Sequence, residues 1–203
     1  MDEPGPDLIA QETGEERTRI ADLLAELDSE LWAADSLCAG WRIREVVAHL
    51  TMPFRLSLPR FVGGMVRARM RFNRFADRDA RTATQSMSDD ALLALLRTNV
   101  NHPWKPPGGG AVGALSHDVI HGLDITVPLR LPGPPASRIA LVLNNAGPRN
   151  LEYFGVDLDG VQLVATDAEV SIGDGSPRRM TAEAVILVVT GRRSLSDVVT
   201  EGP

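Results

Sequence analysis

The sequence predicts a mainly α-helical protein, with a helical bundle followed by a small α/β domain. Through the first two-thirds of the chain, apolar residues recur at spacings of three and four, the period of an amphipathic helix. After the stretch Leu131-Pro-Gly-Pro-Pro135, short runs of β-branched residues appear instead. We therefore expect the bundle over residues 1–130 and the second domain over residues 131–203.

The bundle region contains five expected helices. Thr13-Gly-Glu-Glu16 has the spacing of a capping box, which predicts a helix start at Thr13. Ser88 is a residue type that caps helix N-termini, and two aspartates follow it. A connection rich in proline and glycine precedes the last helix, which Pro128 closes. The expected helices cover residues 13–31, 41–50, 61–75, 88 to at least 96, and 111–126.

The second region mixes both kinds of element. Residues 138–150 are expected to be helical, and residues 161–165 and 169–172 read as short strands joined by a turn. A further turn is expected at Asp174-Gly-Ser-Pro177. Residues 181–190 are apolar enough for a buried helix or a buried strand, and Gly191 ends that run.

Size and charge limit the classes of function. The chain has 203 residues, 43% of them hydrophobic, which is enough for one core or for a larger core with a small satellite. Its formal charge is 21 − 27 = −6, which argues against a broad nucleic-acid or membrane footprint. The N-terminus is acidic, unlike a signal peptide, and Cys38 is the single cysteine. We therefore expect a cytoplasmic protein without nucleic-acid or membrane partners; a homodimer is left open.

Two of the four histidines, His117 and His121, lie four residues apart in an expected helix. Residues at this spacing share one helix face, so both rings can address a single metal ion. A catalytic zinc commonly takes three protein ligands, and His49, at the edge of another apolar stripe, is the candidate third. The competing interpretations are a chance pair on a solvated face and a core histidine.

Three stretches resemble a known family. Cys38-Ala-Gly-Trp-Arg-Ile-Arg-Glu-Val-Val-Ala-His-Leu50 is similar to the N-terminal signature of the mycothiol-dependent maleylpyruvate isomerase family, within the DinB-like metal-binding superfamily. Val119-Ile-His-Gly-Leu-Asp-Ile125 is similar to its second signature. Val161-Gln-Leu-Val-Ala-Thr-Asp167, together with Gly173 and Gly191-Arg192, resembles the small C-terminal domain. The resemblance covers most of the chain.

The resemblance implies a DinB-like four-helix bundle that holds a divalent metal at one end. His49 and His121 match the family's ligand positions. The position four residues before the second ligand is often glutamate in the isomerase, but here it is His117, as in three-histidine DinB-like proteins. Imidazole suits zinc, our first expectation, and also nickel or iron(II). The implied thiol co-substrate is mycothiol.

Other charged residues have competing interpretations. Asp124 lies three residues after His121, so it can fix the tautomer of a ligand histidine, or it can cap nearby backbone. It is also the catalytic candidate, as the one general base near the motif. Asp118 is expected on the solvated surface, and Cys38 is expected to be structural. A run of arginines is expected to pair with acids elsewhere or to steer an anionic substrate: Arg55, Arg60, Arg67, Arg69, Arg71 and Arg74.

Three functions follow from these residues. In the first, the metal activates the thiol of a small cofactor, which attacks a small electrophilic substrate in a transferase or isomerase reaction. In the second, metal-bound water hydrolyses an ester or amide. In the third, the protein is a non-enzymatic metal-binding or ligand-binding module; a structural zinc normally has four protein ligands, and three histidines are one too few.

Overall fold

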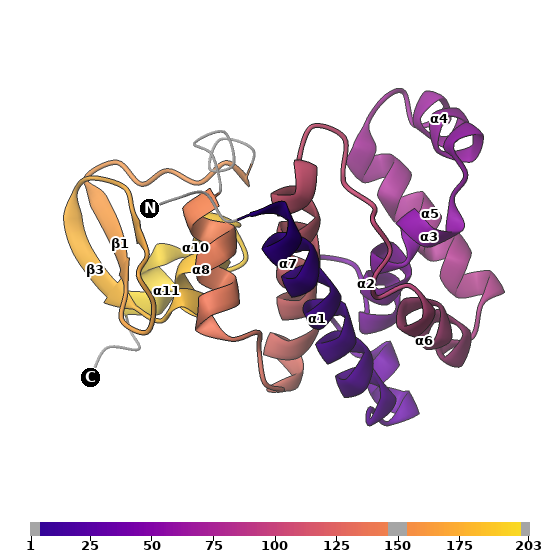
Figure 1. The fold of residues 1–203 in the computed structure, drawn as a ribbon, viewed down its shortest axis with the longest axis horizontal. Helices are drawn as coiled ribbons and strands as arrows, with labels where there is room; N and C mark the ends of the chain where they lie inside the picture. The colour runs from indigo at the N-terminus through magenta and orange to yellow at the C-terminus, as the bar shows by residue number, and fades with distance from the viewer. Residues whose placement is uncertain (1–4, 146–153, 200–203) are drawn as a thin grey trace.

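The computed structural model describes residues 5–145 and 154–199. Helices dominate, and a small sheet lies toward the C-terminus (Figure 1), so the predicted fold class is confirmed. The described elements are α1 (Pro6–Ala25), η1 (Ser29–Ala33), α2 (Ile43–Leu50), α3 (Met52–Arg55), α4 (Leu58–Arg67), α5 (Phe72–Ser86), α6 (Asp89–Thr98), α7 (Gly110–Leu129), α8 (Ala136–Asn145), β1 (Val161–Ala165), β2 (Ser171–Ile172), β3 (Ser176–Met180), α10 (Ala182–Val189) and α11 (Leu195–Val199).

The helical part packs around α2 and α7. Helix α7 lies against α1 and α2, while α5 and α6 cover the rest of α2. Every residue of α2 except Arg44 is buried, because this short helix is enclosed by its neighbours. The core between these helices is aliphatic, with one indole: Ile20, Leu24, Trp32, Ile43, Val46, Val47, Leu50, Ala80, Leu92, Leu96 and Ile125.

The first helix starts earlier than the capping-box spacing predicts. Helix α1 begins at Pro6, a residue that suits the first turn because it needs no backbone N–H partner there. Thr13 therefore lies inside the helix, where its hydroxyl donates to the carbonyl of Ile9 at 2.7 Å. Glu16 is fully buried in ion pairs with two arginines, so it caps nothing. The predicted start at Thr13 is wrong, because the pattern also occurs within helices.

The helix expected over residues 61–75 is two helices. Helix α4 ends at Arg67 and α5 begins at Phe72. Between them Arg69 and Met70 take left-handed backbone angles, with φ of 56° and 58°, which reverse the chain direction. Periodicity did not show the break because no glycine or proline marks it.

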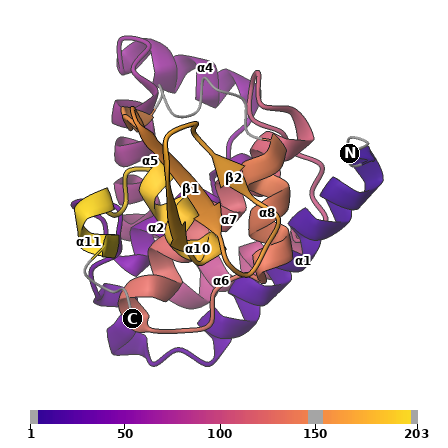
Figure 2. The same ribbon diagram turned by 90° about the vertical axis from the view of Figure 1, so that its left-hand side faces the viewer.

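The C-terminal sheet has the order β2-β1-β3. Strand β1 pairs antiparallel with β2 and parallel with β3, and helices α8 and α10 cover one face of the sheet (Figure 2). The run 181–190, which the sequence left open, is the helix α10, capped by the hydroxyl of Thr181. Strand β3 begins in the predicted turn at Asp174-Gly-Ser-Pro177 and continues to Met180. The expected helix 138–150 is seen to Asn145, and its remainder lies outside the described residues.

Helix α7 is shared between the two parts of the molecule. Its residue Ile125 belongs to the core with α2, whereas Leu115, Val119 and Leu123 pack with α8, α10 and β1. The division into domains at residue 130 stays a prediction. None of the helices in the described ranges has the length and apolar character that a membrane span requires.

Candidate metal centre

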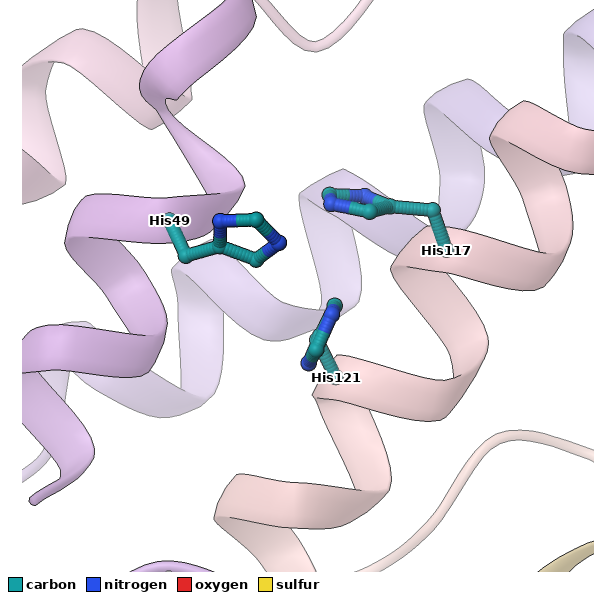
Figure 3. A group of neighbouring side chains, drawn as sticks. All are labelled: His49, His117 and His121. Carbon is teal, nitrogen blue, oxygen red and sulfur yellow. The ribbon is translucent and has the colours of Figure 1, made fainter. Parts of the chain in front are cut away.

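The structure brings His49, His117 and His121 together. One nitrogen from each ring lies within 4.8 Å of the others. The ring centroid of His49 is 5.0 Å from that of His117 and 4.8 Å from that of His121. Figure 3 shows His49 reaching from α2 toward the two rings on α7. The predicted convergence of rings from two helices is therefore present, while metal binding itself stays a prediction.

Helix α2 is held in place at its N-terminus by Glu45. The carboxylate accepts the backbone N–H of Arg42 at 3.0 Å and the guanidinium of the same residue at 2.6 Å. It also accepts the hydroxyl of Thr84 on α5 at 3.0 Å. Burial works to raise the pKa of Glu45, but these hydrogen bonds hold it below its ordinary value. The start of α2 is thus fixed, six residues before His49.

His117 is oriented by a buried pair of charges. Its Nδ1 lies 2.8 Å from Oδ1 of Asp118, and Oδ2 of the same carboxylate accepts from Nε of Arg17 at 2.6 Å. Because Nδ1 faces the carboxylate, Nε2 is the ring nitrogen that is left for another partner. Asp118 is only 2% exposed, so the expected surface position is wrong. Helix α1 covers that side of α7 and supplies Arg17.

His121 has a matching support. Its Nδ1 lies 2.9 Å from Oδ2 of Asp124, and Arg192 binds the same carboxylate from the C-terminal part of the chain. Asp124 also accepts the thiol of Cys38 at 3.1 Å. Burial works to raise the pKa of Asp124, but hydrogen bonds from His121 and Arg192 hold it well below the usual range. Asp124 therefore lies within hydrogen-bond distance of His121, as its tautomer-fixing alternative requires, and that role stays a prediction.

The histidine cluster has the state that a metal site needs. Nε2 of His117 and Nδ1 of His49 are buried and lack a hydrogen-bond partner among the described residues. Burial, followed by the neighbouring histidines, lowers the pKa of His49 well below its ordinary value; burial likewise lowers that of His121. Both rings are therefore neutral at physiological pH, and neutral imidazole is the form that binds metals.

Cys38 is not an activated nucleophile. Burial and the adjacent carboxylate of Asp124 raise the pKa of its thiol to about 12. At neutral pH it is a thiol that donates to Asp124 rather than a thiolate. This geometry agrees with the structural role expected for it.

The three rings lie on the wall of a cavity of about 1220 Å³. Helices α2, α5 and α7 form one side, and α8, β2 and α10 form the other. Much of the wall is apolar, as in most small-molecule sites, and Trp41, Phe72 and Phe154 contribute aromatic surface. Arg192 also reaches this wall, whereas Asp124 lies beneath it with no exposed surface.

Sequence reasoning missed Arg17. It lies among glutamates and arginines in α1, so nothing in the sequence separates it from solvated helix residues. Its Nη1 also donates to the carbonyls of Val100 and His102, at 3.2 and 2.8 Å. These bonds hold the connection between α6 and α7, which places Trp104 with its ring centroid 5.3 Å from that of His117. The same arginine therefore supports His117 from two directions.

Comparison with known families gives a match in the helical part. Residues 13–102 match the family of the mycothiol maleylpyruvate isomerase N-terminal domain. The resemblance seen in the sequence motifs is therefore confirmed. The matched segment of the mycothiol maleylpyruvate isomerase N-terminal domain includes His49 and ends before α7.

Solved structures share the fold of nearly the whole chain. The crystal structure of a histidine-to-alanine mutant of the mycothiol-dependent maleylpyruvate isomerase aligns with a TM-score of 0.58, 10% identity, and coverage of 94% of this chain and 91% of the other. A crystal structure of the mycothiol-dependent maleylpyruvate isomerase without that mutation aligns with a TM-score of 0.56 and 10% identity, and the alignment covers 95% of this chain and 91% of the other. At this identity the likeness shows the fold alone. A comparison with curated proteins gives no match.

Proposed function

We propose that the protein is a metal-dependent enzyme that uses a small thiol of the mycothiol type in a transferase or isomerase reaction on a small electrophilic substrate. One observation carries this proposal. Three imidazoles converge on the wall of a large cavity, and buried nitrogens of two of them have no partner among the described residues. Three protein ligands with one open position is the arrangement of catalytic rather than structural zinc.

The residues fit a divalent cation. Nδ1 of His117 and of His121 each faces a carboxylate, which leaves Nε2 of both rings for a metal, the carboxylate–histidine arrangement common in metal sites. His49, His117 and His121 would hold the ion, with zinc first and nickel or iron(II) also suited to imidazole. A bound divalent cation supplies positive charge beside which a thiol loses its proton near neutral pH.

The chain's own residues favour an external thiol as the nucleophile. Cys38 is the single cysteine, and its raised pKa and its bond to Asp124 keep it protonated. The cavity has room for a cofactor and a substrate together, and much of its wall is apolar. The solved structures with this fold are of an enzyme named for mycothiol, which supports that thiol as the first one to test.

Hydrolysis by activated water is less well supported. That reaction needs a general base at the cavity surface. Asp124, the candidate, is fully buried, and both of its oxygens accept from Arg192. We propose that Asp124 positions His121 instead. His117 in place of the glutamate often found in the isomerase makes a transferase and an isomerase equally open as the reaction class.

The test is metal analysis of the purified protein together with thermal-shift screening of mycothiol and other small thiols. We expect about one divalent ion per chain, and a ligand that binds only the native state at 100 times its Kd should add about 2.7 kcal/mol of stability. His121→Ala should lose the ion. Arg97→Ala is the control, because Arg97 is exposed on α6 and does not line the cavity.

Turnover with and without added thiol then separates the two enzyme classes. Activity that depends on the thiol supports the proposal. Activity without thiol assigns the hydrolase. A metal content that His121→Ala leaves unchanged would show that the three rings hold no ion, and the proposal would fail.

A further inference from the structure

Exposed apolar side chains gather on one surface. Among the described residues, five of the seven exposed large apolar side chains lie between residues 58 and 72. Leu58, Val62 and Val66 are spaced by four and form a line along α4, and Leu58 is 75% exposed. Met70 and Phe72 follow along the chain, Met70 in the turn after α4 and Phe72 at the start of α5. We call these five residues the α4 surface; exposed apolar residues that gather in one segment mark an interaction site, whereas scattered ones do not.

The opposite face of α4 is firmly packed. Phe61 and Met65 lie against Phe75 of α5, and the rings of Phe61 and Phe75 meet edge to face at 5.3 Å. Gly64 allows this approach, because a Cβ there would lie 2.3 Å from the Phe75 ring. The helix therefore already has a buried face, and the α4 surface is a second apolar face that the described chain leaves uncovered.

Arginines without an ion pair among the described residues alternate along the chain with the residues of the α4 surface. Arg60, Arg67, Arg69, Arg71 and Arg74 are exposed, and none of them makes an ion pair within the described ranges. Arg55, which pairs with Asp79 at 2.7 Å, is the one member of the run for which the expected pairing holds. Residues 46–76 contain six arginines and no acid, a charge of +6, so the rest of the chain carries 15 − 27 = −12.

We propose that the α4 surface binds peripherally to an anionic phospholipid membrane. An apolar line flanked by cations is the pattern of helices that lie in the membrane interface. Each arginine near an anionic surface adds attraction, whereas acidic groups more than about 10 Å away are screened by physiological salt. The net charge of the whole chain argued against membrane contact. That total hides the local excess of arginines in residues 46–76.

The same charges argue against a symmetric dimer through this surface. A two-fold interface places the same patch of both copies face to face. The five arginines of one copy would then face those of the other, and like charges repel. An anionic membrane instead complements both features of the surface.

Docking in this way would place the cavity near the lipid. Phe72 belongs to the α4 surface and also lines the cavity, as does Asn73 beside it. Membrane binding itself follows from the surface alone. That an apolar electrophile would enter the cavity from the bilayer rests on the proposed function.

The experiment is flotation of the full chain with vesicles of phosphatidylcholine, alone or mixed with phosphatidylglycerol. We expect flotation with the anionic vesicles only, weakening as salt increases. Leu58→Ser/Val62→Ser/Val66→Ser should abolish it. Arg60→Gln/Arg67→Gln/Arg71→Gln should lower partitioning by on the order of 100-fold, about fivefold per arginine. All substituted side chains are exposed, and circular dichroism checks that each variant folds.

Matched controls come from elsewhere on the surface. Leu8→Ser/Leu31→Ser removes exposed leucines, and Arg97→Gln/Arg178→Gln/Arg179→Gln removes exposed arginines; both should float like the unchanged chain. Absence of flotation, equal flotation with neutral vesicles, or equal loss in the controls would overturn the proposal. Two other results would also overturn it, provided that Leu58→Ser/Val62→Ser/Val66→Ser abolished them. One is self-association of the chain in sedimentation. The other is binding of the chain to an acidic protein without flotation on vesicles.

Discussion

Arg192 binds both carboxylate oxygens of Asp124, with its Nε 2.9 Å from Oδ1 and its Nη2 2.9 Å from Oδ2. Asp124 is fully buried and in turn meets His121. A residue of the C-terminal part thus fixes a histidine of the helical part. A planar, bidentate guanidinium does this better than an ammonium group, because it leaves neither oxygen unpaired.

Replacing Arg192 tests this connection. Arg192→Met leaves the buried charge of Asp124 without its partner, so we expect a loss of about 3–5 kcal/mol in the free energy of unfolding. Metal affinity, measured by chelator competition, should fall by about 10–100-fold. Arg192→Lys should recover part of both, and Arg97→Met, at an exposed position, should change neither. Equal metal affinity in Arg192→Met and the unchanged chain would contradict the role of this pair.

Asp118 provides a second test, on the other α7 histidine. Asp118→Ala removes the acceptor for His117 Nδ1 and leaves Arg17 as a buried unpaired charge, so metal affinity should fall by about 10–100-fold. Asp118→Asn keeps an acceptor oxygen, so its metal affinity should fall less than that of Asp118→Ala.

Nitrogen NMR of the histidine rings provides a readout that does not depend on activity. In the metal-free protein His117 should carry its proton on Nδ1, and in Asp118→Ala the proton should redistribute between the two ring nitrogens. An unchanged tautomer in that variant would show that Asp118 does not orient the ring.

The lowered pKa of Glu45 predicts how the free energy of unfolding depends on pH. Its folded pKa lies below the ordinary value of 4.5, so its contribution is fully present above that pH and is lost as the pH falls through the folded pKa. Glu45→Gln should therefore cost about 1–2 kcal/mol at pH 7, the usual worth of a lost cap, and progressively less in acid. Denaturant unfolding over a pH series measures this. Asp90→Asn, at an exposed carboxylate, should show a smaller difference, and a pH-independent gap for Glu45→Gln would refute the assignment.

Gly64 tests the packing of α4. Gly64→Ala places a methyl group within contact of a buried ring of Phe75, so we expect a loss of about 1–3 kcal/mol from overpacking. Limited proteolysis should then cut near the turn between α4 and α5 before it cuts elsewhere. Gly63→Ala is the control, because the nearest atom to its Cβ would be the flexible end of Arg67, 3.6 Å away. Equal stability of the two variants would mean that α4 does not depend on this close contact.

Local patterns predicted much of the molecule. The bundle, the sheet strand at 161–165 and the helix after Ser88 follow from spacing and capping, which depend on neighbouring residues only. The pair His117 and His121 was equally visible, because four residues bring two side chains to one helix face. The break between α4 and α5 was not visible in the sequence. It depends on left-handed backbone angles that Arg69 and Met70 adopt without a glycine or proline at that place.

The sequence by itself determined that the protein would be mainly helical and which histidines could meet. Only the tertiary structure decided that Asp118 is buried against Arg17 of α1 and that Arg192 reaches Asp124. It also decided that the exposed arginines between residues 60 and 74 form no ion pair within residues 5–145 and 154–199. The physical reason is the distance along the sequence between the residues that interact. Helix periodicity is set by hydrogen bonds between residues four apart, whereas these ion pairs join residues 101 and 68 positions apart, which only the packing of whole elements brings together.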